Sequence, residues 1–163
     1  MNAIRAKPKI EFLDCPSTVQ VPVRAAAPPA LAPKRILIVD DDALVRNSIA
    51  AVLECEGYEV DGAGDGPSAI KSALEHQPDL VLLDLNLPNM DGWTAFEKID
   101  SVRPLIPVIV ITARPHQYQH AVRLGVDAFM EKPLNFSVLL RAIRKLTHEP
   151  EERHAKRISN PGF

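Results

Sequence analysis

Short apolar runs alternate with helix-like segments from Arg35 onward, and this alternation sets the expected fold. Three of the runs contain four consecutive apolar residues, which is typical of strands buried on both faces of a parallel sheet. The other two runs are shorter, and one of them contains a glutamate. The five expected strands are Ile36–Val39, Tyr58–Val60, Leu80–Leu83, Val108–Ile111 and Ala128–Met130.

The segments between these strands carry apolar residues at helical spacing. Gly57 and Pro78 are stop signals, Pro67 suits a first helical position, and Asn135 can cap the last helix. The inward stripe expected for the first helix is Leu44, Val45, Ile49, Val52 and Leu53. The later helices are expected at residues 67–77, 92–102, 117–124 and 136–146. Because strand–helix–strand connections in one sheet are right-handed, the pattern predicts an α/β fold, an open doubly wound parallel sheet with helices on both faces.

The first 33 residues differ in composition from the rest, which predicts that the chain consists of an N-terminal extension, one domain and a tail. They hold six of its fifteen prolines, so residues 1–33 are expected to form a Pro/Ala-rich, flexible N-terminal extension. Residues 34–147 form the expected domain, and 148–163 a polar C-terminal tail. An alternative is that 10–13 or 19–23 docks on a partner or on the sheet edge. A basic arm for nucleic acid is a weaker alternative, since its four cations are dispersed.

Composition and charge indicate the cellular compartment of the protein but do not indicate a particular partner. The chain has 163 residues and a formal charge of −2. Its two cysteines, Cys15 and Cys55, form no disulfide framework or metal motif, so Cys55 is expected to be a small buried residue. No apolar run approaches the roughly 20 residues that span a bilayer, and no signal peptide is evident. We therefore expect a cytoplasmic protein without a membrane partner.

Polar residues at the strand ends are the candidate chemistry. Parallel strands share one carboxyl edge, which would gather Asp40, Asp41, Asp84, Thr112 and Lys132. Three crowded carboxylates repel one another unless a divalent cation and an ammonium group join them. Oxygen ligands with few protein contacts suit Mg²⁺, and a hydroxyl and an ammonium suit phosphoryl oxygens. The remaining carboxylate can act as nucleophile, and Asp84 is the candidate for an aspartyl-phosphate.

These residues resemble the receiver domain of two-component response regulators, in particular the single-domain chemotaxis type. The resemblance covers residues 34–147, with the markers in the family's order. They are Asp40-Asp41 after the first strand, Asp84 within Leu83–Gly92, Thr112-Ala113, Phe129 and Lys132-Pro133. The resemblance implies a flavodoxin-like three-layer α/β/α fold with strand order 2-1-3-4-5.

The resemblance also implies roles for the acidic residues. Asp84 would accept a phosphoryl group from a sensor histidine kinase or a histidine phosphotransfer protein. The Mg²⁺ site would be formed by Asp40, Asp41, Asp84 and the backbone carbonyl of Asn86. Asp41 would bind the metal directly, and Asp40 through water.

The family's switch residues map onto Thr112 and Phe129. Thr112 and Lys132 would bind phosphoryl oxygens, and the Lys132–Pro133 peptide bond would be cis. Phosphorylation would draw Thr112 inward and let Phe129 rotate into the space vacated. An unknown downstream protein would read the face formed by residues 117–146.

Three departures from the family pattern affect this expectation. The segment between Thr112 and Lys132 is about two residues shorter than in the chemotaxis type, so the fourth helix is expected to be short or irregular. Phe129 lacks the hydroxyl of the commoner tyrosine. Arg114 is a candidate to reach over the phosphate and change its rate of hydrolysis.

Simpler roles remain open for several of these residues. Asp42 is expected to cap the first helix, and Asp40 and Asp41 could do no more than that. Thr112 alone would be an ordinary strand-end hydroxyl, and Lys132 alone a solvated charge.

The same holds for the aromatic and histidine candidates. Phe129 is as well explained by the core as by a switch, and Trp93 is expected in the core. His116 and His120 share a helical face at i, i+4, but no third metal ligand accompanies them, so a solvated face is favoured.

Two other function classes compete with the phospho-switch. An aspartate-nucleophile phosphohydrolase would carry its nucleophile on the first strand with a nearby hydroxyl residue, which Asp40-Asp41-Asp42-Ala43-Leu44 lacks. A receiver-like scaffold would not need the intact set of acids. The 16 residues at 148–163 are too few for a helix-turn-helix. We therefore expect a switch protein that is no enzyme beyond its own phosphotransfer and slow autodephosphorylation, with no direct nucleic-acid binding.

Overall fold

The structure of the protein is a computed structural model that describes residues 32–149. The expected N-terminal extension with Cys15, its two candidate docking segments and all but two residues of the expected C-terminal tail lie outside the described residues. The boundaries at residues 33 and 147 therefore stay predictions.

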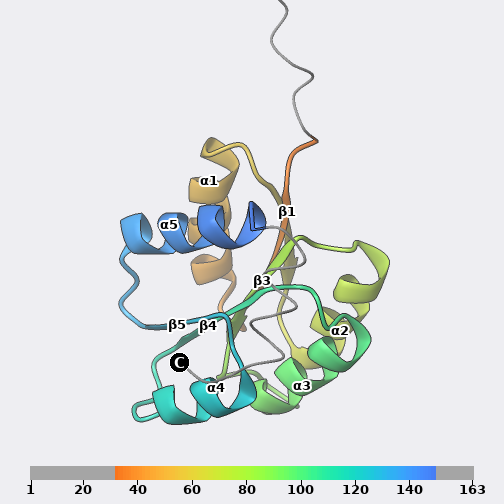
Figure 1. Cartoon of the computed structure of the whole chain (residues 1–163), viewed down its shortest axis with the longest axis vertical. Coiled ribbons are helices and arrows are strands. Elements are labelled where there is room, and N and C mark those ends of the chain that lie inside the picture. Colours follow the sequence, from red (N-terminus) through yellow and green to blue (C-terminus); the bar gives the residue numbers. More distant parts are fainter. Residues whose placement is uncertain (1–31, 150–163) are drawn as a thin grey trace, which may run out of the picture. The chain divides into compact units, whose positions relative to one another are not determined.

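Five strands and five helices alternate along the described residues, and each predicted element is confirmed with its end shifted by no more than a few residues (Figure 1). The elements are β1 (Arg35–Val39), α1 (Ala43–Cys55), β2 (Glu59–Ala63), α2 (Gly66–Glu75), β3 (Leu80–Asp84), α3 (Gly92–Val102), β4 (Val108–Thr112), α4 (Tyr118–Leu124), β5 (Ala128–Glu131) and α5 (Phe136–Thr147). All neighbouring strands pair in parallel, in the predicted order β2-β1-β3-β4-β5.

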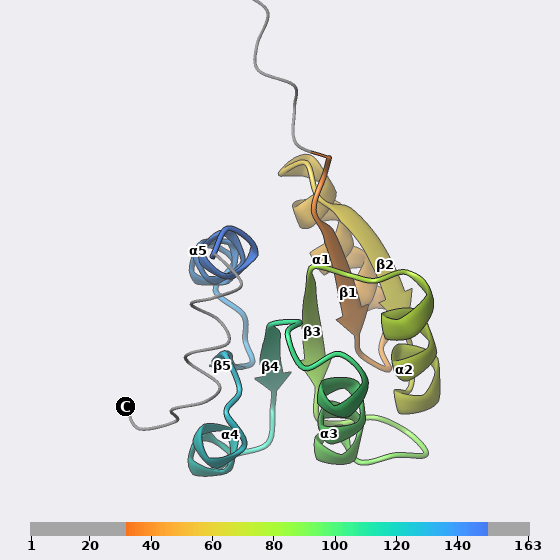
Figure 2. The same ribbon diagram turned by 45° about the vertical axis from the view of Figure 1, so that its right-hand side comes forward.

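The central strands are apolar throughout because helices cover both faces of the sheet. Side chains alternate between the faces along each strand. Ile36 and Ile38 of β1 pack with α1 and α5, whereas Leu37 and Val39 pack with α2 and α3. Figures 1 and 2 show the sheet between these two helical layers. Complete burial of each such side chain is worth about 1.5–3 kcal/mol, so the two apolar clusters hold the strand ends in register.

Side-chain caps explain where four of the helices begin. The carboxylates of Asp42, Asp65 and Asp91 and the amide oxygen of Asn135 each accept a hydrogen bond from a backbone N–H in the first turn. The helix α4 has no side-chain cap and is the shortest of the five, with seven residues. It ends at Gly125, whose φ of +73° is the left-handed conformation that glycine adopts without strain. The short fourth helix agrees with the prediction from the shortened segment.

Three residue-level predictions were wrong. Cys55 is exposed, because it follows the inward Leu53 by two residues and therefore points to the opposite side of α1. Leu44 is 76% exposed, because the helical repeat places it on the opposite side of α1 from the buried Ile49 and Leu53. His116 precedes α4 with a φ of +59°, so it shares no helical face with His120.

Within residues 32–149, all of the helices are too short or too polar to cross a lipid bilayer.

Candidate functional site

Two buried carboxylates lie at the carboxyl ends of adjacent strands. Asp84 is the last residue of β3, and Asp40 directly follows β1, whose Val39 is aligned with Leu83. The side chains of Asp40 and Asp84 are each only 4% exposed. Such burial of two anions is costly unless a positive charge lies close to both.

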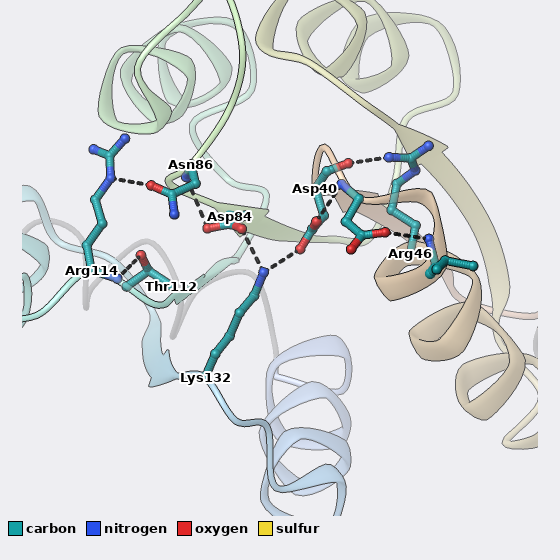
Figure 3. Close-up of polar contacts among 9 residues, drawn as sticks. Asp40, Arg46, Asp84, Asn86, Thr112, Arg114 and Lys132 are labelled. Atoms are coloured by element: carbon teal, nitrogen blue, oxygen red, sulfur yellow. Dashed lines mark hydrogen bonds and ion pairs between the residues drawn. The ribbon is translucent and has the colours of Figure 1, made fainter.

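Lys132 supplies that charge from the loop after β5 (Figure 3). Its Nζ lies 2.7 Å from Asp40 Oδ2 and 2.7 Å from Asp84 Oδ2, although these residues are 92 and 48 positions away in the sequence. The backbone N–H of Lys132 donates to the carbonyl of Thr112 at 2.9 Å, which fixes the root of the side chain. Burial works to lower the pKa of Lys132, but its hydrogen bonds to both carboxylates outweigh burial and raise the pKa. The lysine is therefore held as a cation that bridges the two acids.

The second oxygen of each carboxylate is oriented by the backbone. Asp84 Oδ1 accepts from the N–H of Asn86 at 3.0 Å, and Asp40 Oδ1 accepts from the N–H of Asp42 at 2.9 Å. The Arg46 guanidinium donates to the carbonyl oxygen of Asp40 and holds the start of the loop against α1. Arg46 was not predicted as part of the site, since a helical arginine six residues after an acid carries no recognised signal.

Asp41 completes an acidic triad that is typical of a magnesium site. One carboxylate oxygen from each of Asp40, Asp41 and Asp84 lies within 4.8 Å of the others. Asp41 is exposed, whereas the other two are buried, so the triad opens to solvent on the side of Asp41. Together with Lys132 these groups carry a formal charge of −2, which a divalent cation would neutralise. Hard carboxylate oxygens in a partly open site fit Mg²⁺.

The structure places the two expected switch residues on neighbouring strands. Thr112 ends β4 and is fully buried, and its Oγ1 accepts a hydrogen bond from the N–H of Arg114 at 3.0 Å. Phe129 of β5 is aligned with Val110 and half-buried, with its ring edge-on to Tyr118 of α4 at a centroid distance of 6.1 Å. Phe129 thus lies between the sheet and α4, and the Lys132–Pro133 peptide bond is cis, as the resemblance implied.

The side chain of Arg114 binds the loop after Asp84. Its Nε donates to Asn86 Oδ1 at 2.6 Å, and a terminal nitrogen donates to Asp91 Oδ1 at 2.7 Å. Partial burial works to raise the pKa of Asp91, but the hydrogen bond from Arg114 and the N–H of Trp93 outweigh it and lower the pKa. Asp91 was missed as a partner, although its place before Gly92 is a recognisable helix-cap signal.

The remaining aromatic and histidine candidates lie beside α4. Trp93 is half-buried and packs against the core, as expected, but its indole N–H also donates to Gln117 Oε1 at 2.9 Å. The ring of His120 lies edge-on to Trp93 at 4.7 Å. His120 is therefore an aromatic contact of Trp93, and His116 lies outside the helix.

Comparison with known protein families gives a match over the region of the chain that contains this site. The family description that matches is the response regulator receiver domain, over residues 36–144. The chain is 41% identical over 117 residues to the transcriptional regulatory protein PdtaR of Mycobacterium tuberculosis. That match covers 70% of this chain and 57% of PdtaR, so the chain spans little more than half the length of this curated relative.

Solved structures of similar sequence share the fold. A CheY-like response regulator receiver domain protein from Methanospirillum hungatei JF-1 is 34% identical with a TM-score of 0.69, covering 74% of this chain and 98% of that one. The response regulator TrrA from Thermotoga maritima, crystallised in complex with Mg²⁺-BeF, is 33% identical with a TM-score of 0.65. The second match covers 69% of this chain and 98% of TrrA.

Proposed function

We propose, since this chain belongs to the response regulator receiver domain family, that Asp84 is its phosphoacceptor. The family consists of phospho-switches of two-component phosphorelays rather than classical enzymes. A carboxylate oxygen of Asp84 attacks the phosphorus of a phosphohistidine, and the bond from phosphorus to the imidazole nitrogen breaks. The donor is a sensor histidine kinase or a histidine phosphotransfer protein. Slow hydrolysis of the aspartyl-phosphate by the domain itself returns it to its starting state.

One observation supports this assignment above the others: Lys132 bridges two buried acids while a third acid lies beside them. In the proposed state, the lysine and the Thr112 hydroxyl bind phosphoryl oxygens. The residues that would hold Mg²⁺ are Asp40, Asp41, Asp84 and Asn86, the last through its backbone carbonyl and Asp40 through water. When bound, Mg²⁺ supplies positive charge that offsets the charge of the phosphoryl oxygens.

Two surfaces beside the site serve the exchange of signals in this proposal. An apolar groove is lined by Leu44 of α1, by Leu134 and by Phe136, the first residue of α5, and Lys132 also lines it. Leu44 and Phe136 are exposed, so the groove offers apolar area for the phosphoryl donor next to Asp84. The switch is read by a downstream protein at residues 117–146, after Thr112 moves inward and Phe129 rotates.

The proposal extends to the rest of the sequence as expected above. Residues 1–33 act as an extension and 148–163 as a tail of a receiver domain at 34–147. The protein works in the cytoplasm, where phosphohistidine donors and Mg²⁺ are available.

Acetyl phosphate tests the proposed function. Wild-type protein with Mg²⁺ and acetyl phosphate is expected to gain one phosphoryl group by intact mass spectrometry, and Asp84→Asn to gain none. Asp42→Asn is the matched control, because it changes a neighbouring acid whose capping hydrogen bond asparagine can replace. A gain that persists in Asp84→Asn, or turnover of p-nitrophenyl phosphate without any stable label, would contradict the proposal.

A further inference from the structure

The loop between β4 and α4 is fastened to the start of α3 at both of its ends. At its first end, Thr112 Oγ1 accepts from the N–H of Arg114, and the Arg114 guanidinium binds Asn86 and Asp91. Figure 3 shows Arg114 extended from Thr112 towards Asn86. Asp91 is also the cap of α3, since its Oδ2 accepts from the N–H of Trp93 at 3.1 Å. A single carboxylate therefore joins Arg114 to the first turn of α3.

At the second end of the loop, Trp93 is the anchor. Its indole N–H donates to Oε1 of Gln117, the residue before α4, and its ring contacts His120 in the first turn of α4. Gln117 forms no side-chain cap for α4, because its side chain is directed to Trp93 and to the carbonyl of Pro115. The position of α4 thus depends on α3 as well as on Phe129.

These contacts form a continuous series from Thr112 through Arg114, Asp91 and Trp93 to Gln117. A movement of Thr112 towards Asp84 must either stretch its hydrogen bond from Arg114 or carry the Arg114 backbone with it. The first outcome costs a hydrogen bond, and the second pulls on a guanidinium that is held at two points on the loop after β3. The contacts therefore oppose the movement of Thr112 and transmit it when it occurs.

We propose that Arg114 is a positioning residue that couples the movement of Thr112 to α4 through Asp91 and Trp93, and that this coupling restrains the unphosphorylated state. The inference rests on the proposed function, because it needs a phosphoryl group at Asp84 to move Thr112. It assigns to Arg114 a mechanical role through α3 in place of the contact with the phosphate that the sequence suggested.

Trp93 is the only tryptophan of the sequence, so its fluorescence reports on this coupling directly. The probe is beryllofluoride with Mg²⁺, and its binding is followed separately by ¹⁹F NMR. In the wild type, binding is expected to change the emission of Trp93 as Gln117 and His120 shift. In Arg114→Ala, bound fluoride signals are expected to persist while most of the emission change is lost. Because a partly exposed ion pair no longer opposes the switch, the affinity for beryllofluoride is expected to rise about two- to fivefold.

Two further variants keep the test sharp. Asp91→Asn retains a side-chain cap for α3 but removes the charge that holds Arg114, so it is expected to behave like Arg114→Ala. Arg123→Ala is the matched control, since Arg123 lies on α4 and its Nε donates to the carbonyl of Gln119 at 3.4 Å. It should respond like the wild type.

The outcomes separate this inference from the proposed function. If the wild type shows no bound fluoride signal, the proposed function itself fails. If beryllofluoride binds but the emission of Trp93 is unchanged, or if Arg114→Ala retains the full emission change, the coupling through Arg114 is refuted.

Discussion

Replacing Lys132 with methionine tests the electrostatics of the site without involving phosphorylation. Methionine keeps an unbranched side chain of similar length but removes the charge. The carboxylates of Asp40 and Asp84 then remain side by side, each 4% exposed, with no ammonium group 2.7 Å away. The third acid, Asp41, adds to the repulsion.

The size of the effect follows from the burial of the acids. Removal of one partner from a buried ion pair typically destabilises a protein by about 3–5 kcal/mol, because the remaining charge stays uncompensated. The Lys132 side chain is 24% exposed, so water can reach part of the site and the lower end of that range applies. We expect Lys132→Met to lower the free energy of unfolding by about 3 kcal/mol in the absence of divalent cations.

Magnesium should reverse much of this loss. A ligand that binds only the folded protein stabilises it by about 2.7 kcal/mol at a concentration of 100 times its dissociation constant. Mg²⁺ should therefore stabilise Lys132→Met more than the wild type, since it supplies the missing positive charge and has no ammonium group to compete with. The assay is urea denaturation with EDTA and again with Mg²⁺, followed by circular dichroism.

Lys71→Met is the matched control for this experiment. Lys71 is 71% exposed and lies 3.9 Å from Glu75 on the surface of α2, so its replacement should change stability by no more than about 0.5 kcal/mol. The reasoning is refuted if Lys132→Met unfolds at the same urea concentration as the wild type. It is also refuted if Mg²⁺ stabilises both proteins equally.

Three other changes test the packing and the loop contacts. Leu139→Ala should lower the free energy of unfolding by about 2–5 kcal/mol, because Leu139 is fully buried between α5 and the sheet. Val138→Ala, at a half-exposed position, should have little effect, and equal losses of stability in the two variants would contradict the assigned core. Gly92→Ala should destabilise the protein by about 1–3 kcal/mol in thermal denaturation, since a Cβ on residue 92 would lie 2.3 Å from the Cα of Leu85 in the preceding loop. An unchanged melting temperature would exclude this close approach. The lowered pKa of Asp91 means that its ionised form stabilises the fold above its ordinary pKa of 3.8, and that this contribution is lost as the pH falls below that value. Asp91→Asn should therefore be less stable than the wild type at pH 7, and the difference should shrink as the pH falls below 3.8. A difference independent of pH would contradict the ion pair with Arg114.

The strands and the residues at their ends were predictable because both depend on local pattern and on one topological rule. Runs such as Leu80–Leu83 are apolar since helices cover both of their faces. Parallel pairing places the residues at the carboxyl end of each strand at one edge of the sheet. The strand order was the predicted one, and Asp40, Asp84 and Lys132 therefore meet at that edge, as expected. The roles of these residues in phosphorylation remain predictions.

Contacts between side chains across loops were not predictable in the same way. A contact of Arg114 with the phosphate stays a prediction, whereas the hydrogen bonds of its guanidinium to Asn86 and Asp91 were not predicted. The choice among acceptors within reach depends on rotamers that the sequence does not specify. The hydrogen bond between Trp93 and Gln117 joins the starts of two helices 24 residues apart, and no sequence motif predicts it.

Errors in the predicted burial have a simpler origin. The inward stripe predicted for α1 was too wide, because it included a residue on the opposite side of the helix from Ile49 and Leu53. That residue is Leu44, which is exposed.

Mapping the modified residue tests the central claim most directly. After treatment with Mg²⁺ and acetyl phosphate, borohydride reduces an aspartyl-phosphate to homoserine, which tandem mass spectrometry can locate in a peptide. We expect homoserine at position 84 and at no other aspartate, with the yield strongly reduced in Lys132→Met and when Mg²⁺ is omitted. Homoserine at Asp40 or Asp41 in place of Asp84, or a yield indifferent to both Lys132 and Mg²⁺, would contradict the account of this site.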